Sequence, residues 1–373
     1  MRIGDFCKTN LYTYSEKEKW NEIYYLDTGN VTRGKITEIQ ILTPGIDTIP
    51  SRARRKVQVK DIIYSTVRPN QRHYGIIKSH SPNMLVSTGF VVITVDQQIA
   101  DPDFMYYFLT QDDVVETLEA IGEQSTSAYP SIKPVDIENL EIELPPLDEQ
   151  KKISSILRSI DDKIENNQKI NDNLQQQVYA LFDSWFVSFD QTDGKMPADW
   201  REGTLGEITT ITSGKRPPMK QPTATTEVSI PLVGAASIMG FTNAVLYNEP
   251  ILVTGRVGTH GVVQRFQSPC WTSDNTLVIK SEFYEYAFQA LQRVDYVNMN
   301  RGSTQPLITQ TDLKNVSIVI PAEAILLEYE KIAGTLMAMY ESNRKENERL
   351  AVLRDTLLPR LMNGEIDVSN IQL

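Results

Sequence analysis

Residue types that catalytic and metal-binding proteins often use are scarce in this chain of 373 residues. It has two cysteines, Cys7 and Cys270, and three histidines, His73, His80 and His260. No CxxC motif and no Cys/His cluster is present, which argues against a zinc site and against a disulfide framework. The expected compartment is therefore a reducing cytoplasm.

Long apolar runs are also lacking. No stretch of eighteen apolar residues occurs, so we expect no membrane span. The first twenty residues are polar, so we expect no export signal. Since 40% of the residues are hydrophobic, the chain can still bury more than one core, and its length suggests two or three domains.

Motifs that would mark an enzyme are absent as well. There is no Asn/Asp-Pro-Pro-Tyr/Phe motif, since the Pro-Pro pairs at 145–146 and 217–218 have other neighbours. No GxxxxGK[ST] phosphate loop and no GxSxG elbow is found. The glycine-rich segment 255–261 does not match GxGxxG, and it suits a tight loop that presents Arg256. A catalytic function is therefore the least supported.

Charge is distributed unevenly along the chain. The net charge is −11 and the pI is near 5.0, which by itself disfavours a nucleic-acid partner. Segment 33–78, however, holds ten Lys/Arg against three acids, a local balance of +7 that leaves −18 for the remainder. A local basic face matters more for phosphate binding than the total charge does.

An internal repeat organises the chain. Residues 126–189 and 302–365 correspond at a constant offset of 176, with Pro130 matching Pro306. The earlier parts match more loosely, at offsets of 202 and then 188, and the second offset places Arg68 opposite Arg256. Each copy is thus a variable globular region followed by a better-matched helical region.

Two long helices are predicted, over 146–190 and 322–363, from apolar residues spaced by threes and fours. Each could reach about 60 Å at 1.5 Å per residue. A narrow apolar stripe needs a partner, and a two-fold arrangement of the copies predicts that the helices pair antiparallel. Asn167 and Asn343 then lie either in the middle of the seam or facing water.

The globular regions read as α+β. Strands are predicted at 61–67, 90–95, 140–144, 277–280 and 316–320, and short helices at 103–110 and 283–293. The predicted division of the chain is a first globular domain at 1–145, a spacer helix at 146–190, a second globular domain at 195–321, a second spacer helix at 322–363 and a tail at 364–373.

Several segments, taken in order, resemble the specificity subunit of Type I restriction–modification enzymes. LPPLDEQKKISSIL (144–157) with LFDSWF (181–186) resembles the central conserved region of that family, and LLPRLMNGEID (357–367) resembles its C-terminal conserved region. MPADWREGTLGEI (196–208) is similar to the start of a second target-recognition domain. STVRPN (65–70), STGFVVI (87–93) and GSTQPLI (302–308) also look like recurrent family segments. The second copy departs from the family at 321–324, which lacks the PPLDEQ helix start.

The resemblance implies a fold and a function. Two α/β target-recognition domains would be separated by two long helices that form an antiparallel coiled coil, with a pseudo-two-fold internal repeat. Each domain would read one half of a split double-stranded DNA site. The helices would set the gap and dock two modification (methyltransferase) subunits, which restriction subunits then join. The chain itself would hold no cofactor, because S-adenosylmethionine would sit on the methyltransferase. Trp185 and Phe186 are candidates for contact with that subunit.

Loop-like segments with forked cations and amides are the candidate DNA contacts, since Arg reads guanine, and Asn and Gln read adenine. In the first region they are Arg52, Arg54, Arg55, Lys56, Arg68, Asn70, Arg72, His73 and Tyr129. In the second they are Lys215, Arg216, Arg256, His260, Ser303, Thr304 and Gln305. For the basic run 52–56 the alternative is a solvated face, and for Arg68 or Arg256 it is a structural ion pair. The histidines read more readily as ordinary surface or core residues.

Three other hypotheses stay open at this point. A free-standing DNA-binding regulator with two reading heads predicts tight specific binding by the isolated chain, which the acidic total charge disfavours. A scaffold whose globular ends bind proteins predicts no salt-sensitive affinity for DNA. An enzyme in its own right would need reacting groups that the sequence does not offer.

Overall fold

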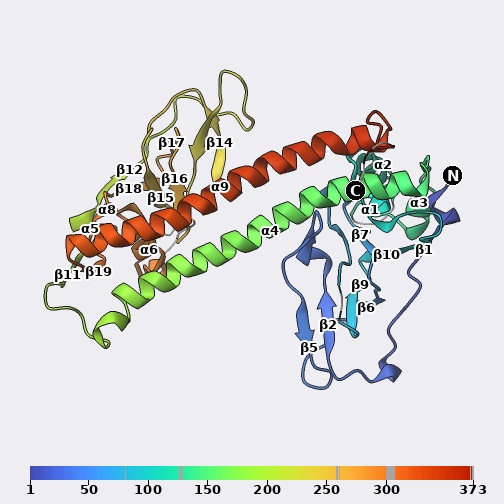
Figure 1. The fold of residues 1–373 in the computed structure, drawn as a ribbon, viewed down its shortest axis with the longest axis horizontal. Helices are drawn as coiled ribbons and strands as arrows, with labels where there is room; N and C mark the ends of the chain where they lie inside the picture. The colour runs from blue at the N-terminus through green and yellow to red at the C-terminus, as the bar shows by residue number, and fades with distance from the viewer. Residues whose placement is uncertain are drawn as a thin grey trace. The chain divides into compact units, whose positions relative to one another are not determined.

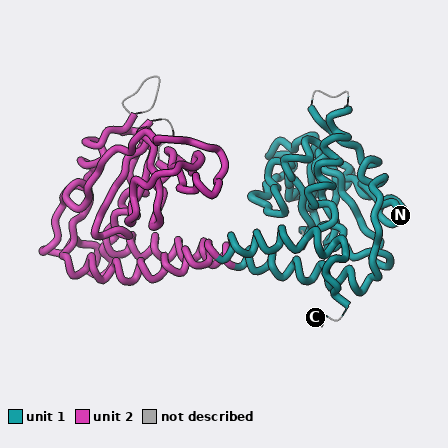
Figure 2. The backbone as a smooth tube through the Cα atoms, turned by 90° about the horizontal axis from the view of Figure 1, so that it is seen from above, with its two compact units in different colours: residues 1–166, 346–373 teal, residues 167–345 magenta. Residues whose placement is uncertain are grey.

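The computed structural model (Figure 1) describes residues 1–79, 81–125, 129–257, 259, 261–299, 307–369 and 371. They form two compact units, coloured separately in Figure 2. Unit 1 comprises residues 1–166 and 346–373, and unit 2 comprises residues 167–345. Each unit therefore combines one globular region with segments of both long helices.

Unit 1 stacks helices on one sheet and that sheet on a second (Figure 1). The sheet orders are β1-β10-β7-β8 and β5-β2-β9-β6. In β10, Val91 and Ile93 face the core shared with the helices, whereas Phe90 and Val92 face the second sheet. Because successive side chains of a strand point to opposite faces and both faces are covered here, β10 is apolar on both faces.

The elements of unit 1 outside the long helices are β1 (Cys7–Thr9), β2 (Ile23–Leu26), β3 (Val31–Thr32), β4 (Lys35–Ile36), β5 (Gln40–Leu42), β6 (Ala53–Lys56), β7 (Ile62–Ser65), β8 (Tyr74–Ile76), β9 (Met84–Ser87), β10 (Phe90–Val95), α1 (Pro102–Thr110), α2 (Asp112–Glu123) and α3 (Pro134–Glu138).

Unit 2 repeats the same layers. Its main sheet has the order β12-β18-β15-β16 and its second sheet the order β14-β13-β17. Leu277 and Ile279 of β18 face the helices, while Val278 faces Val233 of the second sheet. The elements are β11 (Arg201–Thr204), α5 (Leu205–Ile208), β12 (Thr210–Ser213), β13 (Ile230–Val233), β14 (Ile238–Thr242), β15 (Ile251–Gly255), β16 (Gln264–Phe266), β17 (Trp271–Thr272), β18 (Thr276–Lys280), α6 (Tyr284–Gln292), α7 (Tyr296–Met299), α8 (Gln310–Lys314) and β19 (Ser317–Ile320).

The hydrogen-bond register confirms the internal repeat. In the second sheets, β2 lies between antiparallel β5 and parallel β9, as β13 lies between antiparallel β14 and parallel β17. In the main sheets, β10 lies between β1 and β7 just as β18 lies between β12 and β15. Both globular regions therefore share the strand order of the main sheet and of three strands of the second sheet, to which β6 adds a fourth strand in unit 1.

The two long helices are present as α4 (Leu147–Phe186) and α9 (Glu323–Met362). Each has 40 residues, and both pairs of ends are 176 residues apart, as in the sequence repeat. The first turn of α4 carries Asp148 and Glu149, where the helix dipole favours negative charge. The second helix starts at Glu323, although the segment before it lacks the family's usual start.

Within each unit the two helix segments run antiparallel (Figures 1 and 2). In unit 1, Asp161 forms an ion pair with Arg354 at 2.7 Å, and the carbonyl of Ile164 accepts a hydrogen bond from the side chain of Asn347. In unit 2, the rings of Phe182 and Tyr329 are in contact with centroids 6.0 Å apart. Partner numbers fall in α9 as they rise in α4, so the predicted antiparallel pairing is confirmed.

Asparagines line the seam of unit 2, as one of the two alternatives predicts. Asn167 is 1% exposed and Asn171 is 7% exposed. The side chain of Asn171 donates to the carbonyl of Tyr340 at 3.1 Å and accepts from Asn343 at 3.0 Å. A buried amide with specific partners stabilises one register of a helix pair over its slipped alternatives.

Two predictions at the ends of the helices are wrong. Segment 140–144 is not a strand, because only Glu141 forms a bridge, with Arg2. Phe186 is not available to a partner, since it is 3% exposed and packs among aromatic rings in the core of unit 2. Trp185 is half-buried against the same core.

Candidate DNA interface

Much of the charge in the basic segment of unit 1 is paired within the fold. Lys56 binds Glu18 at 2.5 Å and lies 5.2 Å from the ring centroid of Trp20. Arg72 binds Asp112 at 2.6 Å. Burial would lower the pKa of Arg72, but its hydrogen bonds, led by the one with Asp112, leave that pKa raised. The local balance of +7 therefore overstates the charge that this segment presents to a ligand.

The remaining cations of β6 and the turn before it differ in their surroundings. Arg52 is exposed, and its side chain makes no ion pair with a described residue. Arg54 is half-buried, and its Nε donates to the carbonyl of Ser51. Burial lowers the pKa of Arg55, whose Nε is enclosed without a hydrogen-bond partner among the described residues. Arg52 is thus the most accessible cation of this run.

Arg68 and Tyr129 come together although they are far apart in sequence. The guanidinium carbon of Arg68 lies 4.8 Å from the ring centroid of Tyr129, which is 58% exposed. The backbone N–H of Arg68 donates to the carbonyl of Pro130 at 2.9 Å, and its φ of 49° is left-handed. The contact pre-orients a solvent-facing arginine at low entropic cost.

Asn70 and His73, which lie near Arg68 in sequence, each make a hydrogen bond within the fold. The backbone N–H of Asn70 donates to the carboxylate of Glu119 at 3.1 Å, while the residue itself is exposed. The Nδ1 of His73 lies 2.6 Å from the carbonyl of Val31, so the nitrogen donates and the imidazole is anchored to β3. The geometry favours a structural role for His73 and an accessible amide at Asn70.

In unit 2, Lys215 and Arg216 are exposed, and their side chains make no ion pair with a described residue. The backbone of Lys215 is held at β17, because its N–H donates to Thr272 and its carbonyl accepts from the indole of Trp271. Six residues later, Gln221 pairs with Phe241 of β14. The segment therefore crosses the second sheet with its cations facing outward.

The predicted match between Arg68 and Arg256 is wrong by two residues. Arg256 donates its N–H to Asn275 and accepts at its carbonyl from Ile308. In unit 1 the residue with the equivalent bonds is Thr66, which donates to Gly89 and accepts from Ile132. The sheet register gives the same match, since Gly255 takes the place of Ser65 and Val257 that of Val67. The offset between the two units is therefore 190 here and not 188, because the preceding loops differ in length. Arg256 is half-buried and remains a candidate on its own surroundings alone.

Other candidates lie outside the described residues. They are His260, Ser303, Thr304 and Gln305. The same holds for 126–128 of the polar segment before Tyr129.

Exposed apolar residues on the two equivalent edge strands were not predicted. Ile41 on β5 is 59% exposed, and Ile39 just before that strand is also exposed. Ile238 and Met239 on β14 are 48% and 41% exposed. Apolar side chains on an otherwise polar surface can contact a thymine methyl group. Ile39 and Ile41 alternate with the polar Gln40, which is a sequence signal, whereas Ile238 and Met239 are adjacent and give none of that kind.

Lys220 is a further cation that sequence reasoning missed. It precedes Gln221, whose carbonyl would lie 2.5 Å from a Cβ at Gly240 of β14. Only glycine allows the two backbones to approach so closely at position 240, where φ is +141°. Lys220 is exposed and makes no ion pair with a described residue, so it adds to the cations that face outward beside Met239.

In the part of the chain that the structure describes, we find neither a metal-binding cluster nor an activated thiol. No cluster of three His, Cys, Asp or Glu suited to a metal ion is found there. Cys7 and Cys270 are both buried, and burial raises the pKa of Cys7 to about 12 and that of Cys270 to about 11. Neither thiol is therefore activated as a nucleophile.

None of the described helices is both long and apolar enough to cross a bilayer.

Comparison with known proteins agrees with this arrangement. The family described as "Type I restriction modification DNA specificity domain" matches residues 1–176 and 197–354. The HindI specificity subunit of Haemophilus influenzae is 24% identical, over 98% of both chains. The MjaIX specificity subunit of Methanocaldococcus jannaschii is also 24% identical, over 86% of this chain and 84% of the relative.

A solved structure shows the same fold. The S subunit of a Type I restriction–modification system from M. genitalium superimposes with a TM-score of 0.64 at 18% identity. The superposition covers 97% of this chain and 95% of that one. The family model matches both halves of the chain, and the superposition agrees with it in fold. The chain therefore belongs to the specificity subunits of Type I restriction–modification enzymes, which are DNA-recognition components rather than catalytic ones.

Proposed function

We propose that unit 1 and unit 2 each read one half of an asymmetric, bipartite DNA site in the cytoplasm, and that α4 and α9 set the spacing. Two methyltransferase subunits dock on the helices and supply S-adenosylmethionine for adenine methylation, and restriction subunits join that core. The chain chooses the site and leaves the chemistry to its partners.

The observation that carries the proposal is the repetition of a shared strand order with different accessible side chains. Unit 1 offers Arg52 and the stacked pair of Arg68 and Tyr129, whereas unit 2 offers Lys215 and Arg216. Exposed cations of this kind bind phosphates, and forked or aromatic groups reach base edges. Because the two sets differ, the two half-sites should differ in sequence.

Roles within the candidate set follow from the surroundings of each residue. Arg52, Arg54, Lys215 and Arg216 are proposed to bind phosphates. Arg68 with Tyr129, Asn70 and Arg256, together with His260, Ser303, Thr304 and Gln305, are proposed to reach base edges. Arg55, Lys56, Arg72 and His73 have internal surroundings, and we propose that they shape the surface that the others use.

Docking of methyltransferase subunits is supported by apolar side chains on the outer faces of the helices. In unit 1, Val352 and Leu353 of α9 are 68% and 46% exposed. In unit 2, Met339 of α9 and Tyr179 of α4 are about half exposed. Large apolar residues on a solvated helix face are typical of a protein interface.

The test is to co-express the chain with its methyltransferase and map modified adenines across a genome. A split, asymmetric motif is expected, and an Arg256→Ala variant should relax the half read by unit 2 only. Lys78→Ala, which removes an ion-paired lysine of unit 1, is the control and should leave the motif unchanged. A stable complex that adds no chain-dependent methylation would refute the proposal.

A further inference from the structure

The hairpin between β13 and β14 in unit 2 exposes apolar side chains where unit 1 exposes charged ones. Its connection is residues 234–237, whereas the equivalent connection of unit 1, residues 27–39, is longer and holds β3 and β4. Arg33 and Lys35 are exposed on that longer connection. In unit 2, Ile238 and Met239 follow the turn directly and are 48% and 41% exposed. The two units therefore offer different chemistry at the same end of the second sheet.

The turn of this hairpin is fixed by hydrogen bonds. The N–H of Gly234 donates to the carbonyl of Ser237 at 2.8 Å, which closes the turn. The carbonyl of Gly234 accepts from the side chain of Gln264 on β16 at 2.8 Å, which ties the turn to the main sheet. A side chain presented on such a turn loses little conformational freedom when it binds a ligand.

A bulge at the start of β14 sets the direction of the two apolar side chains. The register of β14 against β13 shifts between Pro231 and Val233. Such a shift re-aims nearby side chains, and Ile238 and Met239 are both exposed although they are adjacent on one strand. The sulfur of Met239 would lie 3.2 Å from a Cβ at Gly234, so Met239 packs back on the turn. Ile238 is the more exposed of the two, and Met239 supports the turn that carries it.

The turn lies beside a candidate base-reading residue. A Cβ at Gly255 would lie 3.0 Å from the Cβ of Ala235, so the turn is in contact with the end of β15. Arg256 follows Gly255 in the chain. The N–H of Lys215 donates to Thr272, at the end of the strand that pairs with β13. The apolar turn, Arg256 and Lys215 therefore gather at one end of unit 2.

Cations accompany this hairpin, and acids are scarce around it in sequence. The Cε of Lys220 would lie 3.7 Å from a Cβ at Gly240, so this side chain reaches β14. Within residues 208–248 the only acid is Glu227, against the three cations Lys215, Arg216 and Lys220. An apolar tip among cations fits the DNA duplex, because its bases have apolar faces and its phosphates are anionic.

We propose that Ile238 is a wedge that enters one base step of the half-site that unit 2 reads and unstacks it, while Lys215, Arg216 and Lys220 hold the adjacent phosphates. Apolar side chains of this size unstack base steps and kink the duplex in DNA-bending proteins. The proposal rests on the proposed function, because it takes unit 2 as the reader of one half-site. It adds a source of specificity that needs no hydrogen bond to a base, since the cost of deforming DNA depends on its sequence.

A wedge has consequences that a contact with a thymine methyl group does not have. Pyrimidine–purine steps are the easiest to unstack, so a TA or CA/TG step is expected where Ile238 enters. Unit 1 has the charged connection 27–39 at the equivalent place. Its half-site should therefore stay stacked, apart from any adenine that the methyltransferase extrudes. A methyl contact alone would leave both half-sites stacked.

The probe is a duplex that carries the motif found by adenine mapping, with 2-aminopurine in place of one adenine at a time. Its fluorescence, which rises on unstacking, is measured in the complex of the full chain with its methyltransferase. Besides the rise at an extruded adenine, a rise is expected at one pyrimidine–purine step of the half-site that Arg256→Ala relaxes. Ile238→Ala should abolish the rise at this step and keep the rise at the extruded adenine, whereas Ile238→Leu should keep both.

Val245→Ala is the matched control and should leave both rises unchanged. Val245 is also 48% exposed, and it follows the end of β14 that is farther from the turn. Affinity gives a second readout, because a mismatch at the step removes much of the cost of unstacking. The mismatch should tighten binding of the native complex at least about tenfold, but that of Ile238→Ala by less than about twofold.

Three results would overturn the wedge. The first is a rise confined to the extruded adenine, and the second is an unchanged rise at the step in Ile238→Ala. The third is a loss of affinity to the level of Ile238→Ala when uracil replaces the thymines of the half-site, which would mean a methyl contact. A chain that yields no split motif overturns the proposed function and the wedge together, whereas a motif without unstacking overturns the wedge alone.

Discussion

The two units hold the same acidic position in two different ways. Asp103 and Glu285 are each the second residue of a nine-residue helix, α1 and α6. Asp103 pairs with Lys60 and Arg158, whose side chains are 36% and 46% exposed. Glu285 binds Arg265 through two hydrogen bonds, with both side chains less than 10% exposed. The two acids therefore contribute differently to stability although their backbone positions are equivalent, because water reaches the cations beside Asp103 but not the one beside Glu285.

The largest expected difference follows from removing the acid in each unit. Glu285→Ala leaves the Arg265 guanidinium buried without its partner and should cost about 3–5 kcal/mol. Asp103→Ala leaves two cations that water can reach and should cost about 1 kcal/mol or less. Chemical denaturation with hydrogen-exchange mass spectrometry would measure both the size and the unit affected. Equal costs would show that the burial of Arg265 has no energetic consequence.

The amino ends of these helices differ in a way that pH can reveal. In unit 1 the neutral side chain of Gln150 accepts from the N–H of Asp101. In unit 2 the carboxylate of Glu330 accepts from the N–H groups of Glu285 and Tyr286. Burial raises the pKa of Glu330 to about 7, against the lowering effect of the two backbone hydrogen bonds.

An acid whose pKa is raised by folding binds protons more tightly in the folded state than in the unfolded state. Its stabilisation is therefore full below the unfolded pKa near 4.5 and is lost as pH rises through about 7. The loss relative to acid conditions is at most about 3 kcal/mol. The free energy of unfolding of the native chain minus that of Glu330→Gln should fall across this window. A difference that stays flat from pH 5 to 8 would contradict the raised pKa.

The long helices and the repeat could be predicted from the sequence, because the spacing of apolar residues shows which face of a helix is buried. The ends of α4 and α9 differ by the same 176 residues that the sequence repeat shows. It could not settle whether Asn167 faced water or the seam, since both positions fit the helical spacing. The structure places it in the seam at 1% exposure.

The candidate site was predicted less well, because exposure depends on contacts distant in sequence. The run 52–56 has four cations among five residues and reads as one basic surface, yet Lys56 is bound by Glu18 and Arg55 is enclosed. The error at Arg256 has a similar origin. A two-residue difference in loop length preserves the local resemblance to Arg68 while moving the residue to the position of Thr66 in the sheet.

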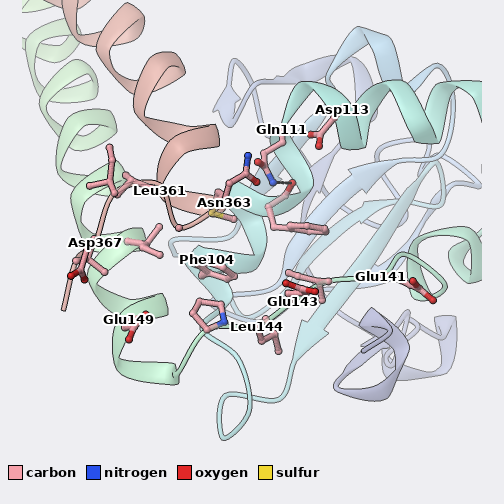
Figure 3. A pocket seen from close by; sticks show the side chains of 18 residues that line it. Phe104, Gln111, Asp113, Glu141, Glu143, Leu144, Glu149, Leu361, Asn363 and Asp367 are labelled. Atoms are coloured by element: carbon pink, nitrogen blue, oxygen red, sulfur yellow. Dashed lines mark hydrogen bonds between the residues drawn. The ribbon is translucent and has the colours of Figure 1, made fainter.

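The aromatic cluster of unit 2 offers the next comparison, because Met362 of unit 1 stands at the position that Phe186 takes in unit 2. Trp200→Ala removes a half-buried indole that packs on Phe186 and should destabilise unit 2 by about 2 kcal/mol. Met362 lines a hollow of about 650 Å³ in unit 1 (Figure 3), so Met362→Trp has room for its larger side chain and should be neutral or stabilising by up to about 1 kcal/mol. Thermal unfolding measures both. A marked loss from Met362→Trp would mean that the hollow is too small for an aromatic ring.

The smallest expected effect lies where the units are most alike. Asn171 donates to the carbonyl of Tyr340 at 3.1 Å, and its counterpart Asn347 donates to the carbonyl of Ile164 at 3.4 Å. Asn171→Ala should cost about 1 kcal/mol, since it removes the side-chain hydrogen bonds to the Tyr340 carbonyl and from the Asn343 amide at a position that is only 7% exposed.

Asn347→Ala should cost less, because Asn347 is half-buried and water can replace its bond. Denaturant titration of the two single variants and the double variant measures both costs and their coupling. If Asn347→Ala proves the more costly variant, bond length and burial do not govern the seam, and the near-symmetry of the two amides has another cause.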